Sequence, residues 1–303
     1  MKRLIIVYNP RSTRFPEVER EVISRARKLK GWVVLKFEVP EESVQKASEK
    51  LSGIIRKDDL VLSAGGDGTA TMVLNAILKS EKRATMGAMG FGNFNDFSET
   101  LGNESFNKII KRFEEGKFEN FYPLEIKINE KFYGFSGMYF SVGMMAEATR
   151  IFEKKKNRKR IRKTKNRLQF VANRAFFWYL KNKRRKDFLP EGVKLNGEKL
   201  LKNTTDYLAL NGREIASLIP AEGWTERKKV FWSGEMRNRN LFRALKIFVR
   251  ALEEELPGGE TTGDVLEFPV PATVFVHAEG EGGEVRNVKK IEVSKFERNI
   301  RVV

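Results

Sequence analysis

Strand and helix signals alternate through about the first hundred residues, and this alternation restricts the fold more than any other feature. Buried strands are predicted from the apolar runs at residues 4–8, 32–39, 60–62 and 84–89. Between them, apolar side chains recur at helical spacing in three groups: Val18, Val22, Ala26, Leu29; Val44, Ala47, Leu51, Ile54; and Ala70, Val73, Leu74, Ile77. Units of this length predict a parallel sheet wound with helices.

The pattern changes at about residue 121 to the period-2 alternation of antiparallel strands. Strands are predicted at residues 124–128 and 132–142, 207–210, 229–232, 273–277, 290–293 and 300–303, and Asn196-Gly197 predicts a two-residue hairpin. Helical patterns interrupt the strands at residues 154–186 and 240–256. We therefore expect an α/β domain at residues 1–120. A mainly antiparallel, β-sandwich-like domain with inserted helices would follow at 121–303, and its last strands could return to the first domain.

Composition excludes several classes of site. The chain has no cysteine and one histidine, His277, which rules out disulfides, cysteine-ligated zinc and multi-histidine metal sites. Any general base is therefore expected to be a carboxylate. A net charge of +18 favours an anionic partner, which could be nucleic acid, a membrane or a phosphorylated ligand. Neither a signal peptide nor an apolar run of roughly 20 residues is visible, so we expect a cytoplasmic protein.

The run Gly65-Gly66-Asp67-Gly68-Thr69 follows a predicted buried strand and begins a predicted helix. Glycines allow the backbone to approach an anion, and the N–H groups of a helix N-terminus can bind phosphate. Asp67 could bind or position Mg²⁺ at the same place. A plain turn between strand and helix would not need three glycines, an acid and a threonine, so the run favours a phosphate site.

Three motifs together resemble the diacylglycerol kinase family. Gly65-Gly66-Asp67-Gly68-Thr69 resembles a signature that this family shares with sphingosine kinases, NAD kinases and, more distantly, phosphofructokinases. The segment from Gly92 to Phe97 resembles the Gly-Thr-Gly-Asn-Asp-Phe run of diacylglycerol-kinase-like proteins. Asn9-Pro10-Arg11-Ser12 resembles their Asn-Pro-x-Ser element. Each motif follows a predicted strand, and the family also combines a nucleotide-binding α/β domain with a β-rich domain.

The resemblance implies an ATP-dependent lipid kinase that uses Mg²⁺ and phosphorylates diacylglycerol or a related lipid alcohol. The residues it implies for ATP are Asn9, Ser12, Gly65, Gly66, Gly68, Thr69, Gly92, Asn93, Asn95 and Asp96. Asp67 would hold the metal–ATP complex. The family has an Asp-Gly-Glu run near its C-terminus, and Glu279-Gly280-Glu281 matches it here. Glu281 is then implied as the catalytic base and Glu279 as a second metal ligand; an exposed acidic turn is the competing interpretation.

The sequence departs from the family pattern at several positions. Phe94 replaces a glycine, Thr13 stands where glycine often follows the serine, and Met72 occupies a position that is usually glutamate. The Asp-rich loop that binds a structural Mg²⁺ in bacterial members has only the poor match at residues 220–223. These departures bear on metal binding and on activity.

Basic and aromatic residues interleave between Lys154 and Lys186. If this segment is helical from Asn166, one stripe carries Arg167, Phe170, Arg174, Phe177 and Lys181, while Trp178 lies on the opposite, apolar face. Such a stripe suits an anionic membrane surface, because the rings can enter the lipid boundary while the cations meet headgroups. A solvated helix and a groove for single-stranded nucleic acid are the alternatives.

Three functions remain to be distinguished. A lipid kinase at the inner membrane face explains both the motifs and the basic stripe. An NAD kinase would share the glycine-rich run without needing the stripe. A catalytically silent nucleotide-binding protein that docks on anionic membrane or nucleic acid is the third. The sequence leaves a homodimer open and does not identify the lipid.

Overall fold

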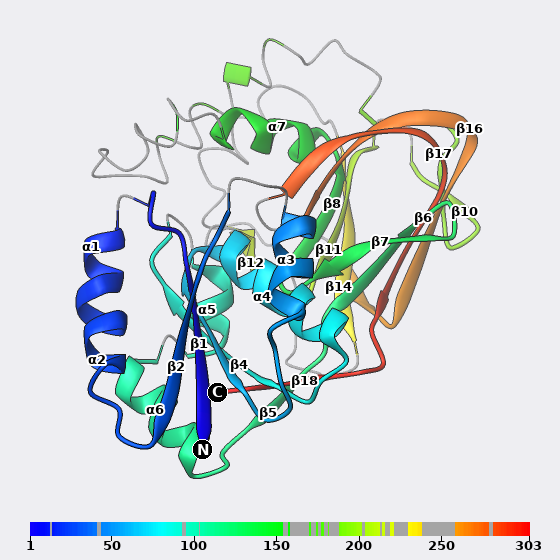
Figure 1. Ribbon diagram of the computed structural model, residues 1–303. Coiled ribbons are helices and arrows are strands. Elements are labelled where there is room, and N and C mark those ends of the chain that lie inside the picture. Colours follow the sequence, from blue (N-terminus) through cyan, green and yellow to red (C-terminus); the bar gives the residue numbers. More distant parts are fainter. Residues whose placement is uncertain are drawn as a thin grey trace. The chain divides into compact units, whose positions relative to one another are not determined.

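The computed structural model describes residues 1–12, 14–40, 44–92, 95–102, 104–153, 157, 170, 174, 177–178, 181, 188–201, 204–212, 214–215, 219–220, 230–237, 258–278 and 281–303. The chain forms two compact units (Figure 1). The first unit comprises Met1–Pro123 and Phe296–Val303, and the second comprises Leu124–Lys295.

The first unit is built on a six-stranded sheet with the order β2-β1-β3-β4-β18-β5. Its strands are β1 (Lys2–Tyr8), β2 (Trp32–Glu38), β3 (Leu60–Gly65), β4 (Thr85–Gly90), β5 (Glu119–Phe121) and β18 (Ile300–Val302). All neighbours pair in parallel except β5, which runs antiparallel to β18. β1 and β3 are buried along most of their length, as their unbroken apolar runs predict for a parallel sheet.

Helices cover both faces of this sheet. Their bounds are α1 (Phe15–Val18), η1 (Glu19–Ile23), α2 (Ser24–Ala26), α3 (Val44–Ser52), α4 (Asp67–Ser80), α5 (Asp96–Thr100) and α6 (Phe106–Glu114). The helical segment α1–η1–α2 and α6 share one core with β1 and β3, while α4 packs against α3 and the sheet. The predicted stripe of α3 is wrong at its last position: the helix ends before Ile54, which is exposed, and Ile55 is buried instead.

The second unit contains a ten-stranded antiparallel sheet, in which β15-β14-β11-β8-β16-β17-β6-β7 follow in order and β9–β10 join through β16. Its strands are β6 (Leu124–Ile128), β7 (Lys131–Ser136), β8 (Tyr139–Gly143), β9 (Lys194–Leu195), β10 (Glu198–Lys199), β11 (Thr204–Leu210), β14 (Phe231–Arg237), β15 (Gly259–Thr261), β16 (Gly263–Ala278) and β17 (Glu281–Lys295). A separate pair consists of β12 (Glu214–Ile215) and β13 (Ile219–Pro220), and α7 (Met144–Glu153) follows β8.

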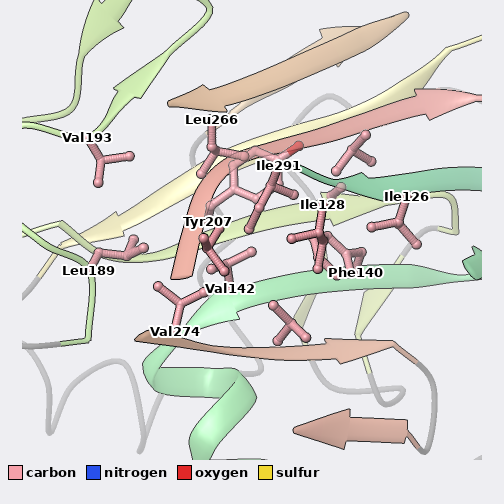
Figure 2. Packing of buried hydrophobic residues seen from close by; sticks show 14 of the residues in the cluster. Ile126, Ile128, Phe140, Val142, Leu189, Val193, Tyr207, Leu266, Val274 and Ile291 are labelled. Atoms are coloured by element: carbon pink, nitrogen blue, oxygen red, sulfur yellow. The ribbon is translucent and has the colours of Figure 1, made fainter. Parts of the chain in front are cut away.

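One hydrophobic cluster forms the core of the second unit. Figure 2 shows Ile126 from β6, Phe140 from β8, Tyr207 from β11 and Ile291 from β17 converging in it. All four side chains are fully buried. The expected fold class, a parallel α/β domain with a second, mainly antiparallel β domain, is confirmed.

Several predicted elements of the second unit have different bounds. The strand predicted at 132–142 is broken into β7 and β8, because Asn211 donates hydrogen bonds to the carbonyl oxygens of Gly137 and Met138, both at 2.6 Å. β16 and β17 are much longer than predicted, since they form one hairpin. The hairpin at Asn196-Gly197 is confirmed, with positive φ at both residues. The predicted helix at 240–256 lies outside the described residues.

No helix among these described stretches is long and apolar enough to cross a membrane.

Candidate active site

The three sequence motifs follow adjacent strands of the first unit and meet at one edge of its sheet. Asn9 follows β1, Gly65 ends β3 and Gly92 comes two residues after β4. β2 lies on one side of β1 and β3 lies on the other. The strand order therefore reverses between β1 and β3. Ligands of open α/β sheets bind at the carboxyl ends of strands, at such a reversal.

The glycine-rich run forms a tight turn from β3 into α4. Gly66 is the N-cap of the fourteen-residue helix α4, with extended φ −94° and ψ −173°. A Cβ atom on Gly65 would lie 2.4 Å from Thr69 Oγ1 and 2.7 Å from Thr69 Cβ, so any side chain there would displace the threonine. The Thr69 N–H donates to the Gly66 carbonyl oxygen at 2.9 Å, and an anion could approach the earlier N–H groups of this helix N-terminus across the glycine turn.

Asp67 is the first residue of α4 and is half-buried. Its Oδ1 accepts a hydrogen bond from the Phe97 N–H at 3.0 Å, which joins the glycine-rich turn to α5. The Phe91 N–H donates to the Gly65 carbonyl oxygen at 2.7 Å, so the turn is also connected to the end of β4. These two bonds fix the carboxyl group at the edge of the sheet.

The loop after β4 is closed by its own polar side chains. Asn95 Oδ1 accepts the Gly92 N–H at 2.8 Å, and Ser98 Oγ donates to the Asn95 carbonyl oxygen at 3.0 Å. A Cβ atom on Gly90 would lie 2.5 Å from Ser98 Oγ and 2.6 Å from Asn95 Cβ. Asn95 therefore shapes the loop through its carbonyl groups, and Asp96 beside it is buried. Asn93, predicted to contact nucleotide, and Phe94 lie outside the described residues.

The loop after β1 is also internally hydrogen-bonded. The Ser12 N–H donates to the Asn9 carbonyl oxygen at 3.0 Å, and Asn9 Oδ1 accepts the Arg11 N–H at 3.0 Å. Tyr8 immediately precedes the loop; burial, together with a 2.9 Å hydrogen bond to Glu38, raises the pKa of its hydroxyl to about 12. The tyrosine is therefore a neutral donor at the end of β1.

Sequence reasoning missed Arg14, which lies at this same edge. Its Nη1 donates to the Gly90 carbonyl oxygen at 3.4 Å, and its guanidinium carbon lies 5.5 Å from the centre of the Phe91 ring. Its Nε donates to both carboxylate oxygens of Glu17 at 3.0 Å. The sequence shows only that a cation follows Ser12 by two residues. Its contacts with Gly90 and Phe91 could not be predicted, because those residues are more than seventy positions away in the sequence.

The predicted acidic partners of Asp67 belong to the second unit. Glu281 is the first residue of β17, where it pairs with Ala278, and the structure describes its backbone only. Glu279 lies outside the described residues, as do most residues of the acid-poor loop at 220–223. Among the residues that are described, no three acidic or histidine side chains gather in a metal-binding cluster. Mg²⁺ at this edge would need Asp67 together with phosphate and water oxygens.

The position where the family usually has glutamate is part of the core. Met72 is fully buried in α4, and its carbonyl oxygen accepts a hydrogen bond from Ser48 Oγ of α3 at 3.1 Å. A charged side chain at this buried position would need a partner. Met72 is thus a packing residue in this chain.

Part of the basic, aromatic stripe is described. Phe170, Arg174, Phe177 and Lys181 are helical, Phe177 is 68% exposed, and the Arg174 guanidinium lies 5.6 Å from the Phe170 ring centre. Trp178 instead packs on Phe188 and Met144. Phe177 is thus exposed while Trp178 packs on the protein, and the membrane contact of the stripe stays a prediction. Arg167 lies outside the described residues.

A hollow at the amino-terminal edge of the same sheet is also lined by charged residues. There Lys2 pairs with Glu114 at 2.9 Å, and Arg3 with Asp59 at 3.4 Å. These charges neutralise one another, and none of the three motifs reaches this edge. The hollow is a poorer candidate than the carboxyl edge.

Comparison with known proteins supports the resemblance over the first unit. Residues 3–123 match the model of the diacylglycerol kinase catalytic domain. A diacylglycerol kinase of Bacillus subtilis is 32% identical over 111 residues, 34% of each chain, and one of Staphylococcus carnosus is 32% identical over 106 residues, 33% of each chain. The matched part thus spans about a third of these relatives. The resemblance to the diacylglycerol kinase family is confirmed for this part of the chain.

Solved structures match the whole chain at low identity. A diacylglycerol kinase structure from Bacillus anthracis has a TM-score of 0.66 at 14% identity and covers 100% of this chain and 96% of its own. An NAD kinase of Archaeoglobus fulgidus in complex with ATP has a TM-score of 0.52 at 12% identity, with 100% and 93% covered. At such identities the similarity establishes a common fold.

Proposed function

We propose that this chain is an ATP-dependent lipid kinase that transfers the γ-phosphate to the hydroxyl of diacylglycerol or a related lipid alcohol. The observation that carries the proposal is the meeting of three motif loops at the carboxyl ends of β1, β3 and β4, with Asp67 anchored among them by the Phe97 N–H. The match of residues 3–123 to the diacylglycerol kinase catalytic domain supports the same activity.

The glycine-rich turn would bind the nucleotide phosphates. Gly65 and Gly66 present backbone without side chains, and α4 directs its positive N-terminus to the same place. Asp67 would hold the magnesium that accompanies ATP, and the loops beginning at Asn9 and Gly92 would border the nucleotide. Bound Mg²⁺ would supply charge neutralisation of the phosphates. The protein's own contribution is then positioning and electrostatic stabilisation, as is usual for phosphoryl transfer.

The acceptor hydroxyl must lose a proton as its oxygen bonds to phosphorus. We assign this proton to the carboxylate of Glu281, with Glu279 as a second metal ligand, because the pair matches the family's Asp-Gly-Glu run. With one histidine and no cysteine in the chain, a carboxylate is the natural base.

A transfer assay tests the proposal. The full chain is incubated with γ-labelled ATP and Mg²⁺, together with either diacylglycerol in anionic vesicles or NAD. Labelled phosphatidic acid is expected. Labelled NADP would replace the proposal with an NAD kinase, whereas ATP binding without either product would favour a catalytically silent nucleotide-binding protein.

We further propose that the stripe of Arg167, Phe170, Arg174, Phe177 and Lys181 docks on the anionic membrane that holds the lipid. The exposed ring of Phe177 beside cations suits that surface. Phe177→Asp should reduce co-sedimentation with phosphatidylglycerol vesicles several-fold. Phe132→Asp, at another exposed phenylalanine of the second unit, is the matched control and should bind normally. Equal binding by both variants, or salt-sensitive RNA binding without vesicle binding, would contradict membrane docking.

A further inference from the structure

Arg14 connects two of the three loops at the carboxyl edge. It follows β1 in sequence, yet its Nη1 bonds to the last carbonyl of β4, on Gly90, and its guanidinium lies over the Phe91 ring. Gly92, where the third motif begins, is the next residue. Arg14 therefore holds the first loop against the start of the third, and all these contacts lie within the first unit.

Arg11 is the one cation among the motif residues at this edge. The residues implied for ATP and metal here are glycines, asparagines, a serine, a threonine and the two acids Asp67 and Asp96. A nucleoside triphosphate brings several negative charges, so cations are needed beside the helix N-terminus and the metal. The first loop offers two. Arg11 bonds to its own loop and to the Val39 carbonyl oxygen at 3.0 Å, whereas Arg14 reaches the end of β4.

The Glu17 carboxylate binds one edge of the Arg14 guanidinium through both of its oxygens. Nε and Nη2 both donate to its carboxylate, which is the geometry in which arginine also binds phosphate. The two side chains are 35% and 40% exposed, so water and salt weaken the pair. A polyphosphate carries more charge than a carboxylate and can replace Glu17 without breaking the contacts to Gly90 and Phe91.

We infer that Arg14 is a nucleotide-phosphate-binding residue that Glu17 holds in position until a phosphate group takes the place of its carboxylate. This inference rests on the proposed function only in taking ATP as the ligand of the carboxyl edge. A phosphate bound to the Arg14 fork would thus lie beside the existing contact between the loops after β1 and β4.

The inference predicts opposite effects for the two partners of one ion pair. Arg14→Ala should weaken ATP binding roughly 10- to 100-fold, because a charge-assisted hydrogen-bond pair is lost, and Arg14→Lys should recover part of it. Glu17→Gln removes the competing anion and should tighten ATP binding a few-fold. In the Arg14→Ala background, Glu17→Gln should have no effect. If the pair only braced the loop, both single changes would weaken binding.

Isothermal titration of the full chain with ATP and Mg²⁺ measures these affinities. Arg25→Ala is the matched control, since Arg25 forms a comparable exposed pair with Glu21 at 2.7 Å on the same helical segment. Its affinity should equal that of the wild type. Thermal unfolding checks that each variant is folded. If Arg14→Ala does not fold, the ATP affinity of Glu17→Gln still tests the inference, because the inference predicts tighter binding.

The outcomes separate this inference from the proposed function. Normal ATP binding by Arg14→Ala, or weaker binding by Glu17→Gln, would overturn the inference and leave the kinase proposal standing. The expected pattern without any lipid phosphorylation would support the inference and contradict the kinase. A wild-type chain that does not bind ATP would overturn both.

Discussion

Asp67 in the first unit and Asp206 in the second have similar local settings. Each accepts, through Oδ1, the N–H of the second residue of a helix: Phe97 in α5 at 3.0 Å, and Met145 in α7 at 2.5 Å. A glycine with no room for a side chain also lies near each aspartate: a Cβ on Gly65, two residues before Asp67, would meet Thr69, and one on Gly143, which pairs with Asp206, would lie 2.2 Å from the Thr205 carbonyl oxygen.

Their surroundings separate the two aspartates. Asp67 is half-buried at an edge where three polar loops end, whereas Asp206 is completely buried, and its Oδ2 has no hydrogen-bond partner among the described residues. Burial raises the pKa of Asp206 to about 7. The same local hydrogen bond thus occurs at the proposed nucleotide site in one unit and in the buried interior of the other. Solvent access, rather than local geometry, distinguishes a candidate catalytic acid from a structural one.

The largest expected effect is on catalysis. Asp67→Asn keeps an oxygen for the Phe97 N–H but removes the negative charge needed for a metal. Provided that the wild type phosphorylates a lipid, kcat should fall roughly 100- to 1000-fold, as when other electrostatic groups of active sites are removed. Steady-state kinetics measures this loss, and unchanged thermal unfolding should accompany it. Activity within threefold of the wild type would show that Asp67 resembles Asp206 in being structural.

A pH-dependent loss of stability is expected from Asp206. Its folded pKa of about 7 exceeds the ordinary aspartate value of 3.8, so the folded state binds the proton more tightly. This contribution to stability is fully present below pH 4 and is lost as pH rises through about 7, and it amounts to roughly 4 kcal/mol in total. Asp206→Asn should remove that decline, as measured by urea unfolding between pH 4 and 8. An exposed control, Asp58→Asn, should keep it.

A smaller but still large effect is expected at the glycine beside Asp206. Gly143 has φ +112°, and an added Cβ would collide with backbone, so Gly143→Ala should lower the free energy of unfolding by about 3 kcal/mol. Gly134→Ala provides the control, because nothing lies within 4 Å of its added Cβ. ATP affinity should be unchanged in both variants. A change in ATP affinity for Gly143→Ala would contradict a purely structural role for the surroundings of Asp206.

The smallest effect concerns a buried hydrogen bond without any expected catalytic role. The Tyr207 hydroxyl donates to Asp264 Oδ2 at 2.8 Å, and Asp264 Oδ1 also accepts from Asn196 at 2.8 Å. Tyr207→Phe should cost about 1–2 kcal/mol of stability because a buried carboxylate oxygen loses its donor. Urea unfolding measures this cost, with exposed Tyr133→Phe as the control. If Tyr207→Phe lowered the free energy of unfolding more than Gly143→Ala does, the predicted order of the two effects would be wrong.

The sequence predicted those parts of the fold that depend on local pattern. Continuous apolar runs identified β1 and β3, and glycines at strand ends identified the edge where the motifs meet. The α3 boundary was missed because helical spacing alone cannot decide whether Ile54 or Ile55 is buried after the helix has ended. The break between β7 and β8 depends on Asn211, which is distant in sequence and bonds to the backbone there.

The candidate site was predictable to the same degree. The positions of the motif residues follow from a parallel sheet, since carboxyl ends of adjacent strands share an edge. The pairing of Asp67 with Phe97 and of Arg14 with Gly90 was not predictable, because each joins segments brought together only by folding. The roles of Glu279 and Glu281 rest on the family's pattern and remain predictions.

The position of β18 affects the order in which the chain can fold during synthesis. Residues 300–302 lie between β4 and β5, and β5 has no other strand partner among the described parts of the sheet. The ribosome therefore has to make the whole second unit before the first sheet can be completed. Until then the free edge of β4 and the unpaired β5 are exposed to solvent and to other nascent chains. The first unit begins first in sequence but is completed last in time.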